Sequence, residues 1–176
     1  MPGGNPPRTR LRNMVLKIVL WAVILLAALA VALVVAGRIG LLRGSEPMNL
    51  GVRDGRLAPP SRTPNSVTSQ AALYPDHPMR EVAQIAPLAL RGDAQATLAK
   101  LRDIVQAMPG ARLVKSDAGY LYVQFTTPLL KFVDDAEFWI DSAAGVIQVR
   151  SASRVGRKDF GVNRQRIESI RRRLAA

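Results

Sequence analysis

The chain has no cysteine among its 176 residues and a single histidine, His77. Without cysteine it can form neither disulfides nor thiolate zinc sites, whichever compartment holds it. His77 lies between two prolines in a predicted loop, and the sequence contains no G-x-S-x-G stretch, so the signature of a Ser-His-Asp hydrolase is missing. Residues 63–71 carry a turn signal but no glycine, and are predicted as a capped turn rather than a phosphate-binding loop.

Acidic residues are scarce, with 13 Asp and Glu against 25 Lys and Arg. The positive excess lies at the two ends of the chain: residues 1–56 carry a net charge of +6, residues 57–149 of −1 and residues 150–176 of +7. A basic chain raises the question of nucleic acid binding. Half of this excess, however, flanks an apolar segment, and the few aromatic residues form no pattern of stacking platforms. We therefore do not expect nucleic acid to be a partner.

The longest apolar run covers residues 18–36, without one charged or polar side chain. As a helix it would be ~28 Å long, close to the ~30 Å hydrocarbon core of a bilayer. We predict a basic tail over residues 1–17 and a transmembrane helix over residues 18–37, with the lipid bilayer as partner. A cleaved signal peptide is the alternative, but its apolar region is usually only ~7–15 residues long.

Basic residues are equally frequent on the two sides of the predicted span. The set before it is more closely spaced and is joined by the free amine, and long C-terminal domains cross largely regardless of charge. This favours a single-pass protein of the cell membrane, with its N-terminus in the cytoplasm and its C-terminal domain outside, in the cell envelope.

Residues 38–63 are rich in Gly, Pro, Arg and Ser and have no periodicity, which predicts a flexible linker before a domain over residues 64–176. In this domain, residues 81–90 are predicted as a first strand that breaks at Pro87. Asp93 is predicted to cap an amphipathic helix that ends at Pro109-Gly110. The C-terminal helix, over residues 162–174, is predicted to turn an apolar stripe toward the sheet: Val162, Ile167, Ile170 and Leu174.

Two hairpins are predicted between these helices, over residues 111–126 and 134–153. In the second, pairing Asp141 with Val146 sets Glu137 opposite Arg150 and leaves the other face apolar. The first hairpin turns Leu113, Leu121, Val123 and Phe125 inward and Arg112, Tyr120, Tyr122 and Gln124 outward. The predicted fold class is α+β: an N-terminal transmembrane helix, then a small two-layer domain with an antiparallel sheet of two hairpins, a mid-domain helix and a C-terminal helix.

Four blocks of the sequence carry a family resemblance. They read PNSVTSQA at 64–71, IAPL at 85–88, FVDDAEF at 132–138 and VRSASRVGRKDFGVNRQRIESIR at 149–171. Over about residues 57–174 the chain thus resembles the bacterial and plant family called domain of unknown function 1499. The resemblance implies a fold and a domain boundary but no reaction, because this family has no established activity. Relatives commonly have a cysteine where this chain has Ser66, so a metal or disulfide role of that cysteine does not carry over.

The stretch 149–168 joins the last predicted strand to the C-terminal helix, and three interpretations remain open. In a structural one, Arg150 and Arg154 form ion pairs with Asp135 and Glu137, and acids beside arginine stay ionised. In a second interpretation, the stretch is a binding site in which arginine side chains and the backbone amides at the start of the C-terminal helix hold an anion. The candidate ligand-binding residues are Arg150, Ser151, Ser153, Arg154, Asn163 and Arg164.

The third interpretation is catalytic: Asp134, Asp135 and Glu137 would hold a metal for hydrolysis. Charge runs are more often solvated faces than sites, so the sequence favours a non-catalytic binding or structural domain at the membrane surface. The expected partner is an anionic ligand, a lipid headgroup or an envelope protein. No catalytic set, metal site or cofactor is assigned, and the metal-assisted hydrolase is kept as the alternative.

Overall fold

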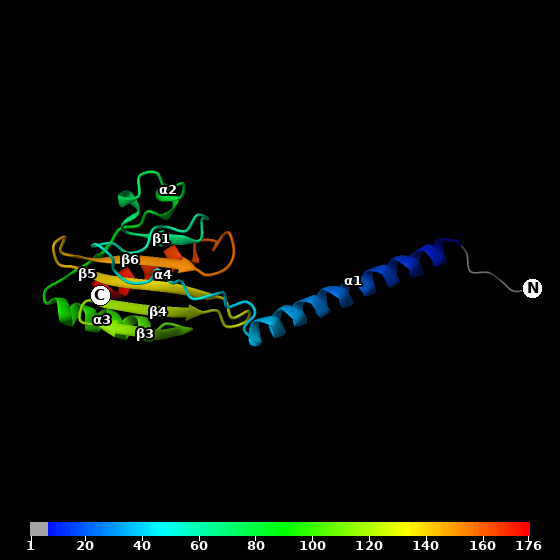
Figure 1. Ribbon diagram of the computed structural model, residues 1–176. Helices are drawn as coiled ribbons and strands as arrows, with labels where there is room; N and C mark the ends of the chain where they lie inside the picture. Colours follow the sequence, from blue (N-terminus) through cyan, green and yellow to red (C-terminus); the bar gives the residue numbers. More distant parts are fainter. Residues whose placement is uncertain (1–6) are drawn as a thin grey trace, which may run out of the picture.

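The computed structural model describes residues 7–176, and its first element is a long helix, α1 (Pro7–Arg38). Figure 1 shows α1 projecting away from a folded domain formed by the residues that follow it. The helix is long and apolar enough to cross a membrane, and no part of its apolar window is buried inside the protein. Residues 7–17, predicted as a basic tail, continue this helix, and residues 1–6 of that tail lie outside the described residues.

The domain is built on one antiparallel sheet, which confirms the α+β fold class. Its strands run in the order β1-β6-β5-β4-β3, and β2 also pairs with β6. The strands are β1 (Ser66–Thr68), β2 (Leu88–Ala89), β3 (Ala111–Asp117), β4 (Tyr120–Thr126), β5 (Val133–Asp141) and β6 (Val146–Ser153).

The β5–β6 hairpin has the predicted register, with Glu137 opposite Arg150 and Asp141 opposite Val146. The hairpin predicted over residues 111–126 is also present, but β3 extends to Asp117, which pairs with Tyr120 and leaves a turn of two residues. Alternation along these strands puts the apolar side chains on one face, and this inner face forms the core. Its buried members include Leu121, Val123, Phe125, Ala136, Phe138, Ile140, Ile147 and Val149.

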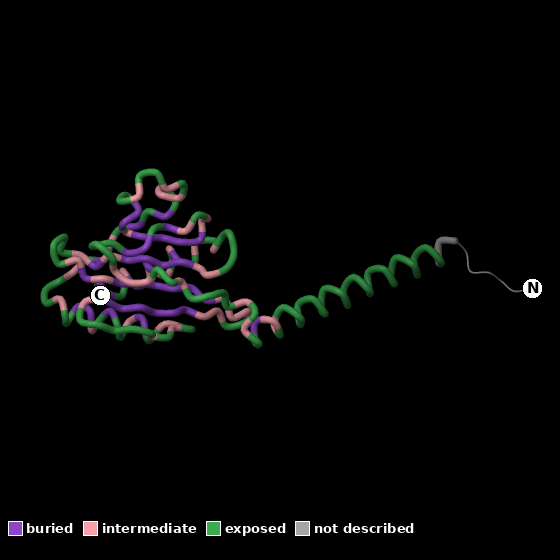
Figure 2. The backbone as a smooth tube through the Cα atoms, in the orientation of Figure 1, coloured by how far each residue is buried: buried purple, intermediate pink, exposed green. Residues whose placement is uncertain are grey.

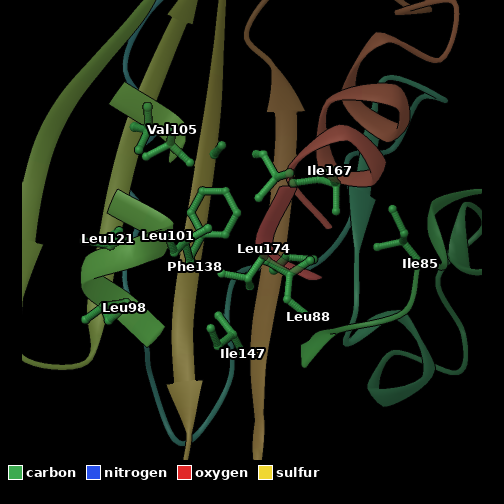
Figure 3. Packing of buried hydrophobic residues seen from close by; sticks show 14 of the residues in the cluster. Ile85, Leu88, Leu98, Leu101, Val105, Leu121, Phe138, Ile147, Ile167 and Leu174 are labelled. Carbon is green, nitrogen blue, oxygen red and sulfur yellow. The ribbon is translucent and has the colours of Figure 1, made fainter. Parts of the chain in front are cut away.

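Two helices cover the inner face, α3 (Ala94–Gln106) and α4 (Val162–Ala175). In Figure 3 their apolar side chains point at Phe138 from both sides. Asp93 caps α3 as predicted, accepting a hydrogen bond of 2.7 Å from the amide of Ala96. In α4 the apolar stripe is buried except Val162, which is 44% exposed, so that member of the predicted stripe is wrong.

The prediction of a strand over residues 81–90 is also wrong for most of its length. The chain forms a short helix, α2 (Arg80–Ala83), then buries Ile85 in the core, and only Leu88 and Ala89 pair with β6. Pro87 has no amide hydrogen to give to a strand, which limits pairing to the residues after it. Conversely, part of the predicted capped turn forms β1, and a 3-10 turn, η1 (Ala71–Leu73), follows it.

The second half of the predicted linker lies on the sheet. Residues 46–59 run over its outer face, the face opposite α3 and α4, and Leu57 is only 1% exposed. The amide of Leu57 donates a 2.8 Å hydrogen bond to the side chain of Gln70, and the hydroxyl of Tyr74 donates one of 2.6 Å to its carbonyl. Figure 2 shows the consequence: buried residues fill the central strands of the sheet, whereas the edge strand β3 and α1 are mostly exposed. We call residues 46–59 the covering segment.

Candidate functional site

A layer of buried polar side chains lies between the outer face of the sheet and the covering segment. The strands supply it by alternation, because every second residue of β4, β5 and β6 points outward. Charges removed from water in this way are stable only when paired and hydrogen-bonded. The members of this outer polar layer are Tyr120, Tyr122, Gln124, Asp135, Glu137, Arg150 and Arg154.

Arg154 and Asp135 are the best-satisfied pair of the layer. The Nε and Nη2 atoms of Arg154 each donate a 2.8 Å hydrogen bond to one carboxylate oxygen of Asp135, and the Tyr122 hydroxyl donates a third of 2.6 Å. Hydrogen bonds to Asp135 raise the pKa of Arg154, so this guanidinium stays charged. Burial, then the hydrogen bond to Asp135, raises the pKa of Tyr122 to about 12. Both groups therefore keep fixed protonation states.

Glu137 and Arg150 face each other less closely. Glu137 Oε1 accepts hydrogen bonds from the amide of Gly51 at 2.7 Å and from the Tyr120 hydroxyl at 2.8 Å. Its Oε2 lies 3.5 Å from Arg150 Nη1, and neither atom has a hydrogen-bond partner within the described chain. Burial raises the pKa of Glu137, although Gly51, Arg150 and Tyr120 act to lower it. Burial thus opposes ionisation of this carboxyl even though an arginine lies beside it.

A second polar group is centred on Asn163, at the start of α4 on the inner side of the sheet. Its Nδ2 donates to Asp159 Oδ2 and Ser153 Oγ at 3.0 Å and to the carbonyl of Asn65 at 3.2 Å. Its Oδ1 accepts from Ser151 and from Arg166. Asn163 is completely buried and fully hydrogen-bonded, so this junction joins β1, β6 and α4 and leaves no donor for a ligand.

The six candidate ligand-binding residues do not converge on one pocket. Arg150 and Arg154 lie on the outer side of the sheet, whereas Ser151, Ser153 and Asn163 meet on the inner side. Arg164 points elsewhere, and its Nη2 donates to the carbonyls of Val82 and Gln84. Arg150 and Arg154 thus belong to the outer polar layer, and Ser151, Ser153 and Asn163 belong to the group centred on Asn163. Arg164 instead holds the backbone of residues 82–84.

The acidic run 134–137 is divided in the same way. Asp134 points to the inner side, where Arg166 Nη2 donates to it at 2.6 Å, and Asp135 and Glu137 point to the outer side. A single metal ion cannot be held by carboxylates on opposite faces of a sheet. Within residues 7–176 there is also no group of three His, Asp or Glu side chains placed to hold a metal. The three carboxylates of this run therefore do not form the metal centre that the hydrolase alternative requires.

Two loops gather at the end of the domain where α1 enters, as Figure 1 shows: residues 127–132 between β4 and β5, and residues 154–161 between β6 and α4. A Cβ atom on Gly37 would lie 2.5 Å from the carbonyl oxygen of Leu130, and one on Gly44 would lie 2.8 Å from Cβ of Arg154. The chain just after the apolar run therefore touches both loops.

Large apolar side chains are exposed on these two loops and on the chain just after the apolar run, together with basic ones. Phe160 is 90% exposed and has a φ of 52°, which is rare for a bulky residue, and Leu129 is 58% exposed. We call this surface the α1-side face. Its apolar members are Ile39, Leu41, Leu129, Val155 and Phe160, and its basic members are Arg38, Arg43, Lys131, Arg157 and Lys158.

Comparison with known proteins places residues 56–174, about two thirds of the chain, in one family. Its description is "Protein of unknown function (DUF1499)". The chain belongs to this family. A search of curated proteins and a search of solved structures each found no match. The family boundary begins within the covering segment, at residue 56, and not after the predicted linker.

Sequence reasoning missed several residues that hold these networks. Arg166 and Asp159 were assigned no contact, although Asp159 accepts hydrogen bonds from the amides of Gly161 and Asn163 at the start of α4. An Asp two residues before a helix-starting Gly is a usable capping signal. Ser66 lies in β1 and accepts a 2.8 Å hydrogen bond from the amide of Ser61. Its position is thus structural in this chain.

Proposed function

We propose that this protein is a membrane-anchored, non-catalytic domain that rests on the anionic headgroups of its own bilayer through the α1-side face. The observation that carries the proposal is the exposure of Leu129 and Phe160 among basic residues, at the end of the domain from which α1 leaves. Exposed large apolar side chains on neighbouring loops are typical of an interaction surface.

The position of the face favours the bilayer as its occupant. The face adjoins α1 because Gly37 and Gly44 contact the loops that carry it. A helix that crosses the membrane over residues 18–36 would bring these loops to the headgroup region. Side chains such as Phe, Leu and Val gain free energy when they enter the interface, at about 25 cal/mol per Å² of buried apolar surface.

The charges favour the same occupant. Arg157 and Lys158 are exposed and shortly precede Phe160 in the sequence. Asp159, which stands between Lys158 and Phe160, instead accepts a hydrogen bond from Asn163. Basic residues near an anionic membrane surface contribute roughly 1 kcal/mol each. The loop 154–161 thus exposes an apolar side chain together with cations, while its one acidic residue, Asp159, is engaged by Asn163.

This proposal keeps the orientation expected from the sequence, with the domain outside the cytoplasm. It leaves the envelope protein as the other candidate occupant of the α1-side face. No observation favours the hydrolase, because Asp134 is separated by the sheet from Asp135 and Glu137.

The test uses the absence of cysteine, which makes one engineered cysteine a unique label. The full chain carrying Leu129→Cys, labelled with a polarity-sensitive dye, is placed in nanodiscs of phosphatidylcholine with or without phosphatidylglycerol. We expect the dye to be shielded from acrylamide in the discs that contain phosphatidylglycerol. The same dye on Ala118→Cys, in the exposed β3–β4 turn, should be quenched in both lipids.

Charge reversal then separates docking from simple proximity. R157E with K158E should remove the shielding of the dye at position 129. The matched control, R102E with K115E, changes two exposed cations outside the face and should keep it. Equal quenching at positions 129 and 118 in phosphatidylglycerol discs would refute the proposal, as would shielding that depends on neither lipid charge nor positions 157 and 158.

A further inference from the structure

A cavity of about 600 Å³ lies between α3, α4 and the β2–β6 pair, among residues that neither polar network nor the α1-side face uses. It is close to the C-terminus, at the end of the domain remote from α1 in Figure 1. Ligand-binding cavities typically measure about 300–1,000 Å³. The size of this cavity therefore suits a small molecule.

The inner surface of the cavity is apolar. Leu88 and Leu174 are buried core residues that reach it, and Val146 and Ala96 add aliphatic surface from β6 and α3. Such a surface binds an alkyl chain by removing it from water, at about 0.8 kcal/mol per buried methylene group. It offers few partners to a sugar or a nucleotide, which need many hydrogen bonds.

Three cations lie around this apolar surface: Arg91, Lys100 and Arg171. Arg91 and Lys100 are exposed, and the ammonium of Lys100 lies 3.3 Å from the carbonyl oxygen of Leu174. Arg171 is fixed more firmly, because its Nη2 donates a 2.6 Å hydrogen bond to the carbonyl of Ala86.

Two carboxylates close to these cations in the sequence are already engaged. Glu168 accepts a 3.0 Å hydrogen bond from Arg171 Nε, and Asp93 caps the start of α3 through the amide of Ala96. Within the described residues neither Arg91 nor Lys100 forms an ion pair, and Lys100 donates only to the carbonyl of Leu174. Both cations can therefore meet an anionic head while the chain lies on the apolar surface.

From this combination we infer that the cavity binds a single-chain amphiphile with an anionic head, such as a carboxylate or a phosphate. The inference does not depend on the proposed docking, because the cavity and the α1-side face share no residue. The protein would then hold such a molecule on the aqueous side of its domain, away from the bilayer.

The experiment measures the melting temperature of the full chain in phosphatidylcholine nanodiscs, followed by the fluorescence of Trp139 in a Trp21→Phe background. Dodecanoate and dodecyl phosphate are titrated, with dodecyltrimethylammonium as the cationic counterpart. A ligand that binds only the folded state raises the melting temperature with concentration. We expect a rise with one or both anions, the larger rise identifying the head, and none with the cation.

Two variants test the site itself. K100E should raise the apparent Kd for the anionic probe roughly tenfold or more, because it replaces an attraction by a repulsion. The control R102E makes the same change two residues away on α3, outside the cavity, and should bind as the parent does. Partition of the probe into lipid affects both variants equally.

Ala96→Trp adds a readout that does not rely on charge, because it fills the cavity from α3. It should abolish the rise in melting temperature. The inference is overturned if neither anion stabilises the parent protein, if dodecyltrimethylammonium stabilises it equally, or if K100E and R102E respond alike.

Discussion

Arg154 and Asp135 are joined by two parallel hydrogen bonds of 2.8 Å, although they stand diagonally across the β5–β6 hairpin. Asp135 is paired in register with Ala152, and Arg154 follows two residues later, which puts both side chains on the same face. The side chain of Arg154 is 8% exposed and that of Asp135 is 1% exposed. The covering segment thus lies over a pair already neutralised by the fork geometry that arginine offers a carboxylate.

Removing one partner of this pair should destabilise the domain strongly, although charged residues of this kind usually lie on the surface. Arg154→Ala leaves the carboxylate of Asp135 buried without its counter-charge, and we expect a loss of about 3–5 kcal/mol in the free energy of unfolding. Arg154→Lys should lose less, because one ammonium keeps the charge but not the two-point contact. Urea unfolding of the full chain in detergent micelles, followed by Trp139 fluorescence in a Trp21→Phe background, measures both values.

Arg157→Ala is the matched control for this measurement, because Arg157 is exposed in the same loop. It should change the free energy of unfolding by no more than about 0.5 kcal/mol. Equal effects at positions 154 and 157 would mean that the Asp135 pair contributes nothing to stability.

The junction at Asn163 should be equally intolerant, for a different reason. Asn163→Asp loses the amide group that donates to Asp159 and Ser153, and places a second carboxylate beside Asp159. We expect a loss of at least about 2 kcal/mol near neutral pH, because buried acceptors are left without donors. The loss should shrink in acid, when a shared proton relieves the repulsion between the two carboxylates. Urea unfolding at several pH values tests this.

Gln165→Glu is the control on the same helix, since Gln165 is exposed and the substitution also adds one negative charge. It should change stability by less than about 0.5 kcal/mol. If Asn163→Asp is as mild, or if its effect does not depend on pH, the hydrogen bonds assigned to the junction are incorrect.

The sequence was most informative where local rules determine geometry. The short β5–β6 turn and the two-residue period fix which residues face each other, and Glu137 does lie opposite Arg150. The Asp93 cap and the apolar spacing in α3 are local in the same sense. The contacts of the covering segment are not local, because Gly51 and Glu137 are 86 residues apart. Residues 46–59 also have no hydrophobic periodicity that would indicate a buried surface.

Helix phase explains the largest error in the predicted site. Arg164 was expected beside Ser151 and Asn163, but Arg166 occupies that place. A step of two residues turns a helix by roughly 200°, so predicting the start of α4 without its packing angle cannot select the right arginine. The strand predicted over residues 81–90 failed for a related reason, because a short apolar run fits a buried turn as well as a strand.

Glu137 should give stability an unusual pH dependence, because burial raises the pKa of its carboxyl above the ordinary value of 4.5. The folded state then holds a proton more tightly than the unfolded state. The stability that this proton contributes is complete below pH 4.5 and is lost as the pH rises through the raised pKa. Glu137→Gln cannot ionise, and its carbonyl oxygen can still accept from Gly51 and Tyr120. Its stability relative to the parent should therefore increase as the pH rises above 4.5.

The difference between the two proteins should grow by up to about 1.4 kcal/mol per pH unit within this window and level off above it. Asp117→Asn, which removes an exposed acid paired with Lys115, should show a difference that changes by only a few tenths of a kcal/mol over the same range. The opposite trend, with Glu137→Gln becoming relatively less stable as the pH rises, would show that attraction to Arg150 outweighs burial. The distance of 3.5 Å between Arg150 Nη1 and Glu137 Oε2 argues for burial, since neither atom has a hydrogen-bond partner within the described chain.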